Sequence, residues 1–256
     1  MGEVFADRLQ VTVDRMGYRD LRDKLLPMLQ GLGCAPDVDD PATETGLWRE
    51  PDGGTLKVTR YGQVAAVGAS GRFLALLRAA SMLGEFLHTL GTEPHKVTVL
   101  DATMDVHVDA PPVLEELYQR GTSGDGVQLS RKRVKPTAIT KVMGQREDGR
   151  ESGTIYFGSR KADVRLAVYD KQHERFYHGV EDALPGVRYE LRLRGGQVTL
   201  ADVYAPASVF WHHMHRTLPR PDGVPPWLPG DTGYTLPRQP VLEPLERLRR
   251  RLVHSP

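Results

Sequence analysis

Acidic side chains recur at every second position in the segment 96–109, KVTVLDATMDVHVD. Side chains of a strand alternate between its two faces, so one face of this segment carries Asp101, Thr103, Asp105, His107 and Asp109. The opposite face is apolar and suits a core. Carboxylates held so close repel one another, and a hard divalent cation such as Mg²⁺ or Mn²⁺ would neutralise them. The alternative is the solvated outer face of a half-exposed sheet, which needs no metal.

A tyrosine stands between two cationic residues in the segment 164–174, VRLAVYDKQHE. If the strand is regular, Arg165 and Tyr169 share a face, and Lys171 continues that face. Cations near a phenol favour the phenolate, which can attack phosphorus, and they can also hold the phosphate. Tyr169 is therefore the candidate nucleophile, with Lys171 and Arg165 as catalytic partners. The alternative is a half-buried strand aromatic with a hydrated hydroxyl.

A carboxylate lies within a row of arginines in the segment 187–194, VRYELRLR. Arg188, Glu190, Arg192 and Arg194 share one face of the predicted strand. Glu190 is either a further metal ligand or the partner of a cross-strand ion pair, and the pattern alone leaves both open.

Three other sets of residues compete weakly for the same chemistry. Tyr156 lies in an apolar strand, where packing is its expected role, and Tyr177 lies in a predicted loop as a second possible nucleophile. His212 and His215 stand about one helical turn apart, but no acid or cysteine is near them in the sequence, so we do not expect a metal there.

The elements that must position these residues alternate between strands and helices. We expect strands at 8–14, 45–50, 55–61, 63–70, 96–109, 137–143, 153–158, 164–170 and 187–194, and helices at 18–32, 71–90, 111–120, 207–216 and 243–252. Runs of strands with a few helices favour an α+β fold of antiparallel sheets backed by helices. The two halves resemble degenerate repeats of one small sheet-plus-helix unit.

Composition excludes several classes of protein. The chain has 256 residues, of which 39% are hydrophobic, which is enough for a sizeable core. No apolar run approaches the roughly 20 residues that span a bilayer, and the N-terminus lacks a signal-peptide pattern. The single cysteine, Cys34, cannot form an internal disulfide. We therefore expect a cytoplasmic protein with no membrane partner.

The net charge is only +1, but basic residues are clustered. The segment 130–135 reads SRKRVK and 246–251 reads ERLRRR, and each is either a phosphate-binding segment or a solvated face. The residues expected to contact DNA are Arg131, Lys132, Arg133, Arg160, Lys161, Arg188 and Arg192.

Three blocks in order resemble the trans-acting initiators of rolling-circle replication, a family that includes plasmid and phage initiators and relaxases of integrative conjugative elements. The family's first block, T-R-[LI]-D-x-x-x-D, compares with TVLDATMD at 98–105. The second, an aromatic strand, a G-S-R turn and R-x-Y-x-K-x-x-E, compares with TIYFGSR at 154–160 and RLAVYDKQHE at 165–174. The third, R-[VI]-E-hydrophobic-x-L, compares with RYELRL at 188–193.

The resemblance implies an enzyme that nicks one DNA strand at an origin and stays linked to the 5′ phosphate through a tyrosine. By position, Tyr169 is then the nucleophile and Lys171 the family's lysine. Asp101, Asp105 and Glu190 fall on the metal ligands. A relaxase for conjugative transfer, or an origin-binding protein that has lost cleavage, are the alternatives.

The blocks also depart from the family pattern. Val99 replaces the arginine of the first block, and Ala167 replaces that of R-x-Y, with Arg165 two residues upstream as its substitute. The D-V-H at 105–107 resembles the histidine-bearing strand of the wider nickase superfamily, so His107 is a further candidate ligand.

We divide the chain into an N-terminal α+β half at 1–95 with a structural or DNA-binding role, a catalytic half at 96–218, and a proline-rich arm with a basic helix at 219–256. The expected partner is origin DNA, single-stranded or extruded. A host helicase and a second copy of the chain are further candidates.

Overall fold

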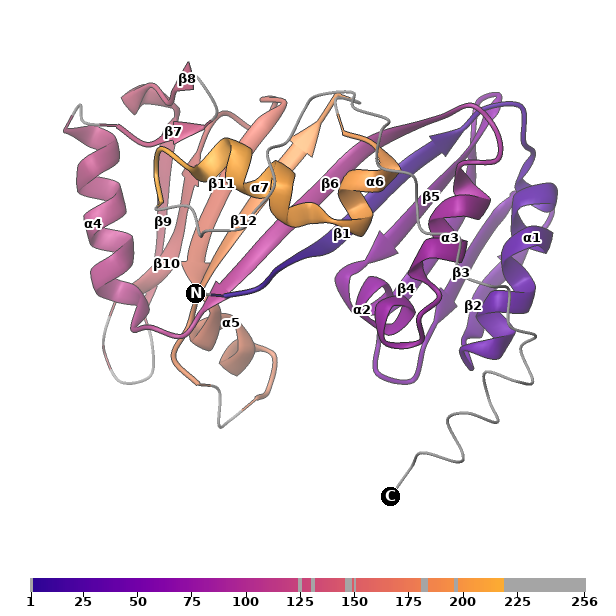
Figure 1. Ribbon diagram of the computed structural model, residues 1–256. Helices are drawn as coiled ribbons and strands as arrows, with labels where there is room; N and C mark the ends of the chain where they lie inside the picture. Colours follow the sequence, from indigo (N-terminus) through magenta and orange to yellow (C-terminus); the bar gives the residue numbers. More distant parts are fainter. Residues whose placement is uncertain are drawn as a thin grey trace. The chain divides into compact units, whose positions relative to one another are not determined.

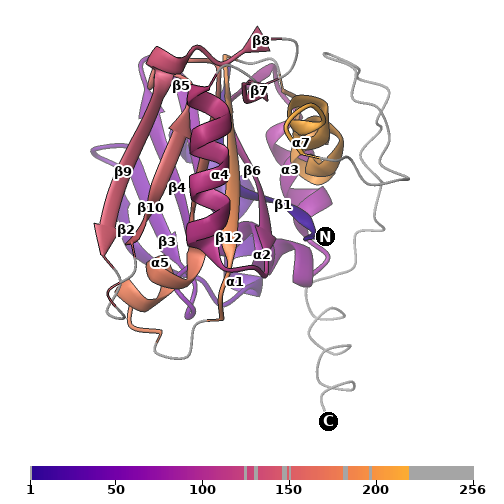
Figure 2. The ribbon, with the colours of Figure 1, turned by 90° about the vertical axis from the view of Figure 1, so that its left-hand side faces the viewer.

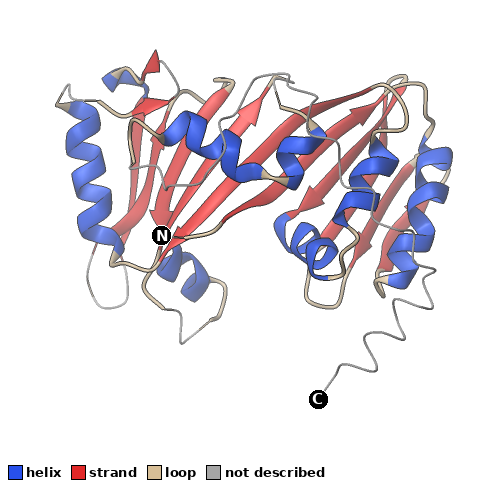
Figure 3. Cartoon of the chain, viewed as in Figure 1, coloured by secondary structure: helices blue, strands red, loops and turns tan. Residues whose placement is uncertain are grey.

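The computed structural model describes residues 2–123, 126–129, 132–145, 149, 151–180, 184–195 and 198–218. These residues form an α+β protein built from antiparallel strands and several helices, as the sequence predicted (Figures 1 and 3). They divide into two compact units. We call them the N-terminal unit, Asp7–Val99 with Thr199–Tyr204, and the site unit, Met1–Ala6 and Leu100–Val198 with the described part of Ala205–Asp231. The arm and basic helix expected after residue 218 lie outside the described residues.

The N-terminal unit is an antiparallel sheet covered by helices. Its strand order is β2-β3-β4-β5-β1. The elements are β1 (Val4–Val13), α1 (Tyr18–Gly31), β2 (Ala35–Asp40), β3 (Thr45–Arg49), β4 (Thr55–Tyr61), β5 (Val64–Ser70), α2 (Gly71–Ala79), α3 (Leu83–Leu90) and α6 (Leu200–Tyr204). Large apolar side chains fill the core between sheet and helices, among them Trp48, Leu56, Phe73 and Phe86.

The single helix expected over 71–90 is wrong, because the structure breaks it into α2 and α3. Ser70 caps the first helix by accepting a hydrogen bond from the backbone N–H of Phe73. Ser81, in the break, has a φ of 57°, a left-handed conformation that stops a helix. Within the described residues no single helix has the length and apolar character to cross a membrane. Only α2 and α3 together meet that test, and they are bent by 118°.

The site unit is also an antiparallel sheet, with strand order β6-β12-β11-β10-β9. Its elements are β6 (His95–Val106), α4 (Ala110–Thr122), β7 (Gln128–Leu129), β8 (Lys132–Arg133), η1 (Pro136–Ala138), β9 (Ile139–Gln145), β10 (Glu151–Phe157), β11 (Val164–Asp170), α5 (Lys171–Tyr177), β12 (Val187–Arg194) and α7 (Pro206–Met214). The bounds expected for β11 and β12 are confirmed. Glycine is required at 153, because a Cβ there would lie 2.1 Å from the carbonyl oxygen of Val142 on β9.

The two faces of this sheet differ in chemistry. Helix α4 lies along one face and contacts β9, β10 and β11 (Figure 2). Apolar side chains of the strands are buried on this side, including Ile155, Leu166, Val168 and Leu191. The alternate residues of the same strands, among them Arg165, Tyr169 and Glu190, point to the opposite face, which is polar. The register of β11 and β12 places Tyr169 beside Arg188, Ala167 beside Glu190, and Arg165 beside Arg192.

Two expectations about the ends of strands are corrected, and one strand was not expected. β6 ends at Val106, so His107 and Asp109 are not on the strand, and Asp109 instead precedes α4. Lys171 does not continue the strand face of Tyr169, because it begins α5. Asp170 causes this change: its carboxylate accepts a hydrogen bond from the backbone N–H of His173 at 3.0 Å and caps the helix. β2, with Pro36 and three aspartates, was not expected at all.

Candidate active site

Tyr169 lines a cavity of about 360 Å³ on the polar face of the site unit. Arg165 and Ala167 of β11 line it from the same strand, and Glu190 and Arg192 line it from β12. β10 contributes Ser152, Gly153, Thr154 and Tyr156, and α5 contributes His173 and Glu174. The cavity therefore combines two phenols, two guanidinium groups and carboxylates. Of the predicted site residues, its described lining includes Tyr169, Arg165, Glu190 and Arg192.

Arginines neutralise the aspartates of β6. Arg188 donates two hydrogen bonds to Asp105, at 2.6 and 2.7 Å, and Arg192 donates two to Asp101, at 2.8 and 2.6 Å. Asp101 is almost fully buried, with a side chain 3% exposed. The hydrogen bonds to Asp101, together with the charge of that carboxylate, raise the pKa of the Arg192 guanidinium above the usual range. Two-point contacts of this kind are geometrically specific and strong.

Arg192 also connects the acid of β6 to the acid of β12. Its Nη2 atom lies 3.0 Å from Glu190 Oε1 and 2.6 Å from Asp101 Oδ2. Through this guanidinium the buried Asp101 is linked to the cavity that Tyr169 lines. The expected association of Asp101, Asp105 and Glu190 on one sheet face is therefore present, with arginines between the carboxylates.

The donor atoms suit a hard cation, since carboxylate oxygens are the usual ligands of Mg²⁺ and Mn²⁺. The arrangement does not offer them freely, because guanidinium groups take up Asp101 and Asp105. Among the described residues no three His, Cys, Asp or Glu side chains lie close enough together to hold a metal ion. A cation at these carboxylates would have to displace an arginine. His107 is exposed, beyond the end of β6.

Lys171 lies beside the candidate nucleophile without being on its strand. Its Nζ atom is 6.0 Å from the centre of the Tyr169 ring and pairs with Glu174 at 2.5 Å. The lysine is thus held within α5 by an acid three residues later. It keeps a positive charge close to the phenol from the helix side of the cavity.

Arg165 is stacked on an aromatic ring. Its guanidinium lies 4.0 Å from the centre of the Tyr156 ring, a cation–π contact. Tyr156 is therefore a residue of the polar face, and its expected role in apolar packing is wrong. Burial lowers the pKa of Arg165, and the positive charges of Arg192, Arg160 and Arg194 lower it further.

The predicted basic segments are only partly described. Arg160 and Lys161 are exposed in the turn between β10 and β11. Arg131 lies outside the described residues, as do the side chains of Lys132 and Arg133, whose backbone forms β8. Arg188 and Arg192 lie on the polar face, but both are engaged with aspartates.

Several cavity residues were not singled out from the sequence. His173 and Glu174 line the cavity only because α5 turns back beside β11. Ser152 lines it from β10, and its hydroxyl donates to Asp170 at 3.0 Å. The N-cap pattern of Asp170 followed by a helix-forming run was the signal that could have revealed α5.

Residues 96–205 match the family model described as replication initiation factor. This segment contains β6 except for its first residue, all of β9–β12, and the lining of the cavity, so the resemblance inferred from the sequence motifs is confirmed for the part of the chain that carries them. Among solved structures, a rolling circle replication initiator protein from Geobacillus stearothermophilus is similar at 16% identity. The match covers 75% of this chain and 74% of that chain, with a TM-score of 0.47. No curated protein matches the chain.

Proposed function

We propose that the chain nicks and rejoins one strand of DNA to initiate rolling-circle replication of a plasmid or phage, with Tyr169 as the nucleophile. One observation carries the proposal: the cavity that Tyr169 lines also holds Arg165, Glu190 and Arg192, within the segment that matches replication initiation factors. A phenol with two guanidinium groups beside it is suited to attack on a phosphodiester.

The chemistry follows from these groups. The Tyr169 hydroxyl loses its proton and its oxygen attacks the phosphorus in line. The bond from phosphorus to the 3′ oxygen breaks, and that oxygen takes up a proton to become a 3′-hydroxyl. The enzyme keeps the 5′ phosphate as a phosphotyrosine diester, so the reverse attack by a 3′-hydroxyl can reseal a strand. Arg165 and Lys171 supply positive charge where the phosphate is held.

The resemblance also implies a divalent cation, Mg²⁺ or Mn²⁺. Asp101, Asp105 and Glu190, with His107 as a further candidate, would hold it only after a rearrangement, since as arranged no three such side chains of the described residues lie close enough together. Such an ion would polarise the scissile phosphate. Arg188 and Arg192 compete with it for the same oxygens, because they already neutralise these carboxylates.

Covalent trapping tests the proposal. The protein is incubated with Mn²⁺ and labelled single-stranded DNA carrying candidate origin sequences, and a denaturing gel then separates covalent adducts from free DNA. We expect an adduct with the wild type and none with Tyr169→Phe, which keeps the ring and removes the nucleophilic oxygen. Tyr177→Phe is the matched control, since Tyr177 is 82% exposed at the end of α5. An adduct that survives Tyr169→Phe contradicts the proposal.

The arginine pairs also favour a second candidate, a protein that binds origin DNA without cutting it. If Arg188 and Arg192 stay bound to the aspartates, no cation enters and the polar face serves as a binding surface alone. The same experiment separates the two: salt-sensitive DNA binding with no adduct under any divalent metal supports the second candidate.

A further inference from the structure

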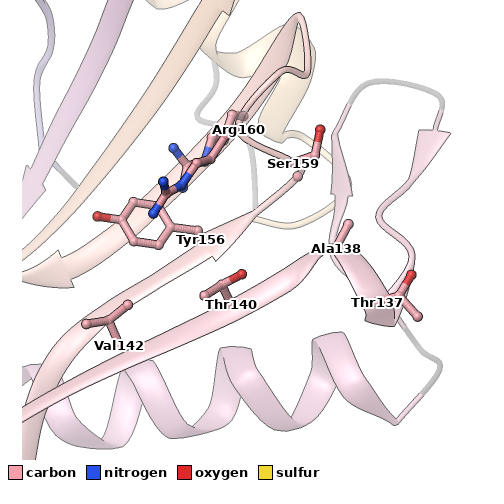
Figure 4. A pocket seen from close by; sticks show the side chains of 9 residues that line it. Thr137, Ala138, Thr140, Val142, Tyr156, Ser159 and Arg160 are labelled. Carbon is pink, nitrogen blue, oxygen red and sulfur yellow. The ribbon is translucent and has the colours of Figure 1, made fainter.

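A second cavity, of about 560 Å³, adjoins the one that Tyr169 lines. The two share Tyr156 and Arg165 in their linings, so they lie next to each other on the polar face of the site unit. The second cavity is also lined by Thr137, Ala138, Thr140, Val142, Gly158, Ser159 and Arg160. Figure 4 shows that Thr140, Val142 and Tyr156 gather on the same side of β9 and β10. The opposite side of β9 faces α4, where Lys141 pairs with Glu115.

The side chains that line this cavity carry positive charge, and the charge of Arg165 is not neutralised by an acid of its described lining. Arg160 and Arg165 both line the cavity, and no acidic side chain of the described residues does. The Nε atom of Arg165 is buried and has no hydrogen-bond partner within the described part of the chain. Leaving a buried N–H of a charged group without a partner is costly, which indicates a position for an acceptor that arrives with a ligand. This sets Arg165 apart from Arg188 and Arg192, which are bound to aspartates.

The remaining lining suits a nucleotide. Tyr156 supplies an aromatic ring, and Thr137, Thr140 and Ser159 supply hydroxyl groups, while Ala138 and Val142 are apolar. The volume lies within the roughly 300–1,000 Å³ typical of sites for small ligands. Aromatic side chains beside cationic ones are how proteins hold single strands without reading their sequence.

We propose that this cavity holds the nucleotide next to the scissile phosphate of a single DNA strand. Its phosphate contacts Arg165 and Arg160, and its base lies among Tyr156, Thr140 and Val142. The inference rests on the proposed function, because it assigns the path of the DNA past Tyr169. The second cavity then positions the DNA strand, and cleavage takes place in the cavity that Tyr169 lines. Arg165 lines both cavities.

Thr140→Glu tests the subsite because Thr140 lines only the second cavity and is exposed, so the change leaves the fold intact. Met143→Glu is the matched control, since Met143 is exposed on the same strand and lines neither cavity. Both variants carry Tyr169→Phe, so that no DNA is cut. The probe is a fluorescein-labelled oligothymidylate of about 15 nucleotides, and fluorescence anisotropy gives its dissociation constant at several salt concentrations.

We expect Thr140→Glu to weaken binding by about tenfold or more, because the carboxylate occupies the subsite and pairs with its arginines. The slope of log affinity against log salt should fall by about 0.7, the value for one phosphate contact on a single strand. Met143→Glu should change the affinity by less than about threefold, since exposed charges are screened. Equal losses in the two variants overturn the subsite.

A further comparison separates failure of the subsite from failure of the proposed function. In proteins that retain Tyr169, the wild type and Met143→Glu should both form the covalent adduct, and Thr140→Glu should form less of it, because its carboxylate pairs with Arg165. If the adduct forms and oligothymidylate binding is unaffected by Thr140→Glu, the subsite is wrong while the nicking activity stands. If the wild type neither binds the oligonucleotide nor forms an adduct, both are wrong.

Discussion

Arg192 binds Asp101 through two hydrogen bonds, of 2.8 and 2.6 Å, and the same guanidinium reaches Glu190 at 3.0 Å. Asp101 is buried and Glu190 lines the cavity of Tyr169, so one side chain of β12 neutralises two acids that the sequence predicted as metal ligands. A divalent cation that binds the carboxylate oxygens of Asp101 and Glu190 has to displace the guanidinium of Arg192. Metal affinity at this site is therefore coupled to the position of Arg192.

Replacing Arg192 should increase metal affinity. In Arg192→Gln the amide carries no charge, and Asp101 is left buried without its counterion, which should lower the free energy of unfolding by about 3 kcal/mol. Mn²⁺ should recover part of this loss, because a ligand that binds only the folded state stabilises it. We expect the rise in melting temperature on adding Mn²⁺ to be larger for Arg192→Gln than for the wild type.

Arg194→Gln is the control for this measurement. Arg194 is the next arginine on the same face of β12. Its guanidinium donates to the backbone carbonyl of Arg160, and no acid of the described residues pairs with it. The melting temperature of Arg194→Gln should rise on adding Mn²⁺ by as much as that of the wild type. Equal stabilisation by Mn²⁺ in wild type and Arg192→Gln would show that Arg192 does not compete with metal.

The turn between β10 and β11 should contribute to DNA affinity through charge alone. Arg160 and Lys161 are both exposed there, so replacing both by Gln should leave stability within about 0.5 kcal/mol. If each contacts one phosphate, the salt dependence of single-strand binding should fall by about 0.7 per residue. Binding titrations at several salt concentrations give this slope, and an unchanged slope would exclude the turn from the DNA path.

The buried histidine of α7 should make the protein acid-sensitive. Burial lowers the pKa of His213 to about 4, with the charges of His212 and His215 as further causes. The unfolded chain, whose histidine has a pKa near 6.5, then binds a proton that the folded chain does not. The free energy of unfolding should decrease as pH falls from about 6.5 to 4, by about 3 kcal/mol.

Urea unfolding at a series of pH values, followed by tryptophan fluorescence, measures this dependence. His213→Gln removes the titrating group and should flatten the decrease over the same interval. A wild-type stability that stays constant between pH 6.5 and 4 would contradict the assignment of His213 as a buried neutral side chain.

The strands of the site unit were predictable because their alternation is regular. The bounds of β11 and β12 and the shared face of Arg165 and Tyr169 follow from a period of two. The partner of each acid was not predictable, since the register between β6 and β12 depends on tertiary structure. The pattern left both readings of Glu190 open, and its contact with Arg192, two residues further along the same strand, could not be foreseen from it.

Breaks in the pattern were harder to foresee. Nothing in the segment at 80–82 resembles the glycine or proline that usually ends a helix, yet Ser81 takes a positive φ and separates α2 from α3. The residue after β11 is similar: the capping carboxylate of Asp170 starts a helix at Lys171, which alternation alone placed on the strand face of Tyr169. In both places a local backbone conformation overrides the periodic signal.

The central claim is that the phenol of residue 169 becomes joined to DNA, and peptide mapping of the adduct tests it most directly. Trypsin separates the three tyrosines in question into ESGTIYFGSR, LAVYDK and FYHGVEDALPGVR, which contain Tyr156, Tyr169 and Tyr177. After nuclease digestion of the trapped complex, mass spectrometry identifies the peptide that retains a nucleotide. The account predicts the modification on LAVYDK, and a nucleotide found on either of the other two peptides would contradict it.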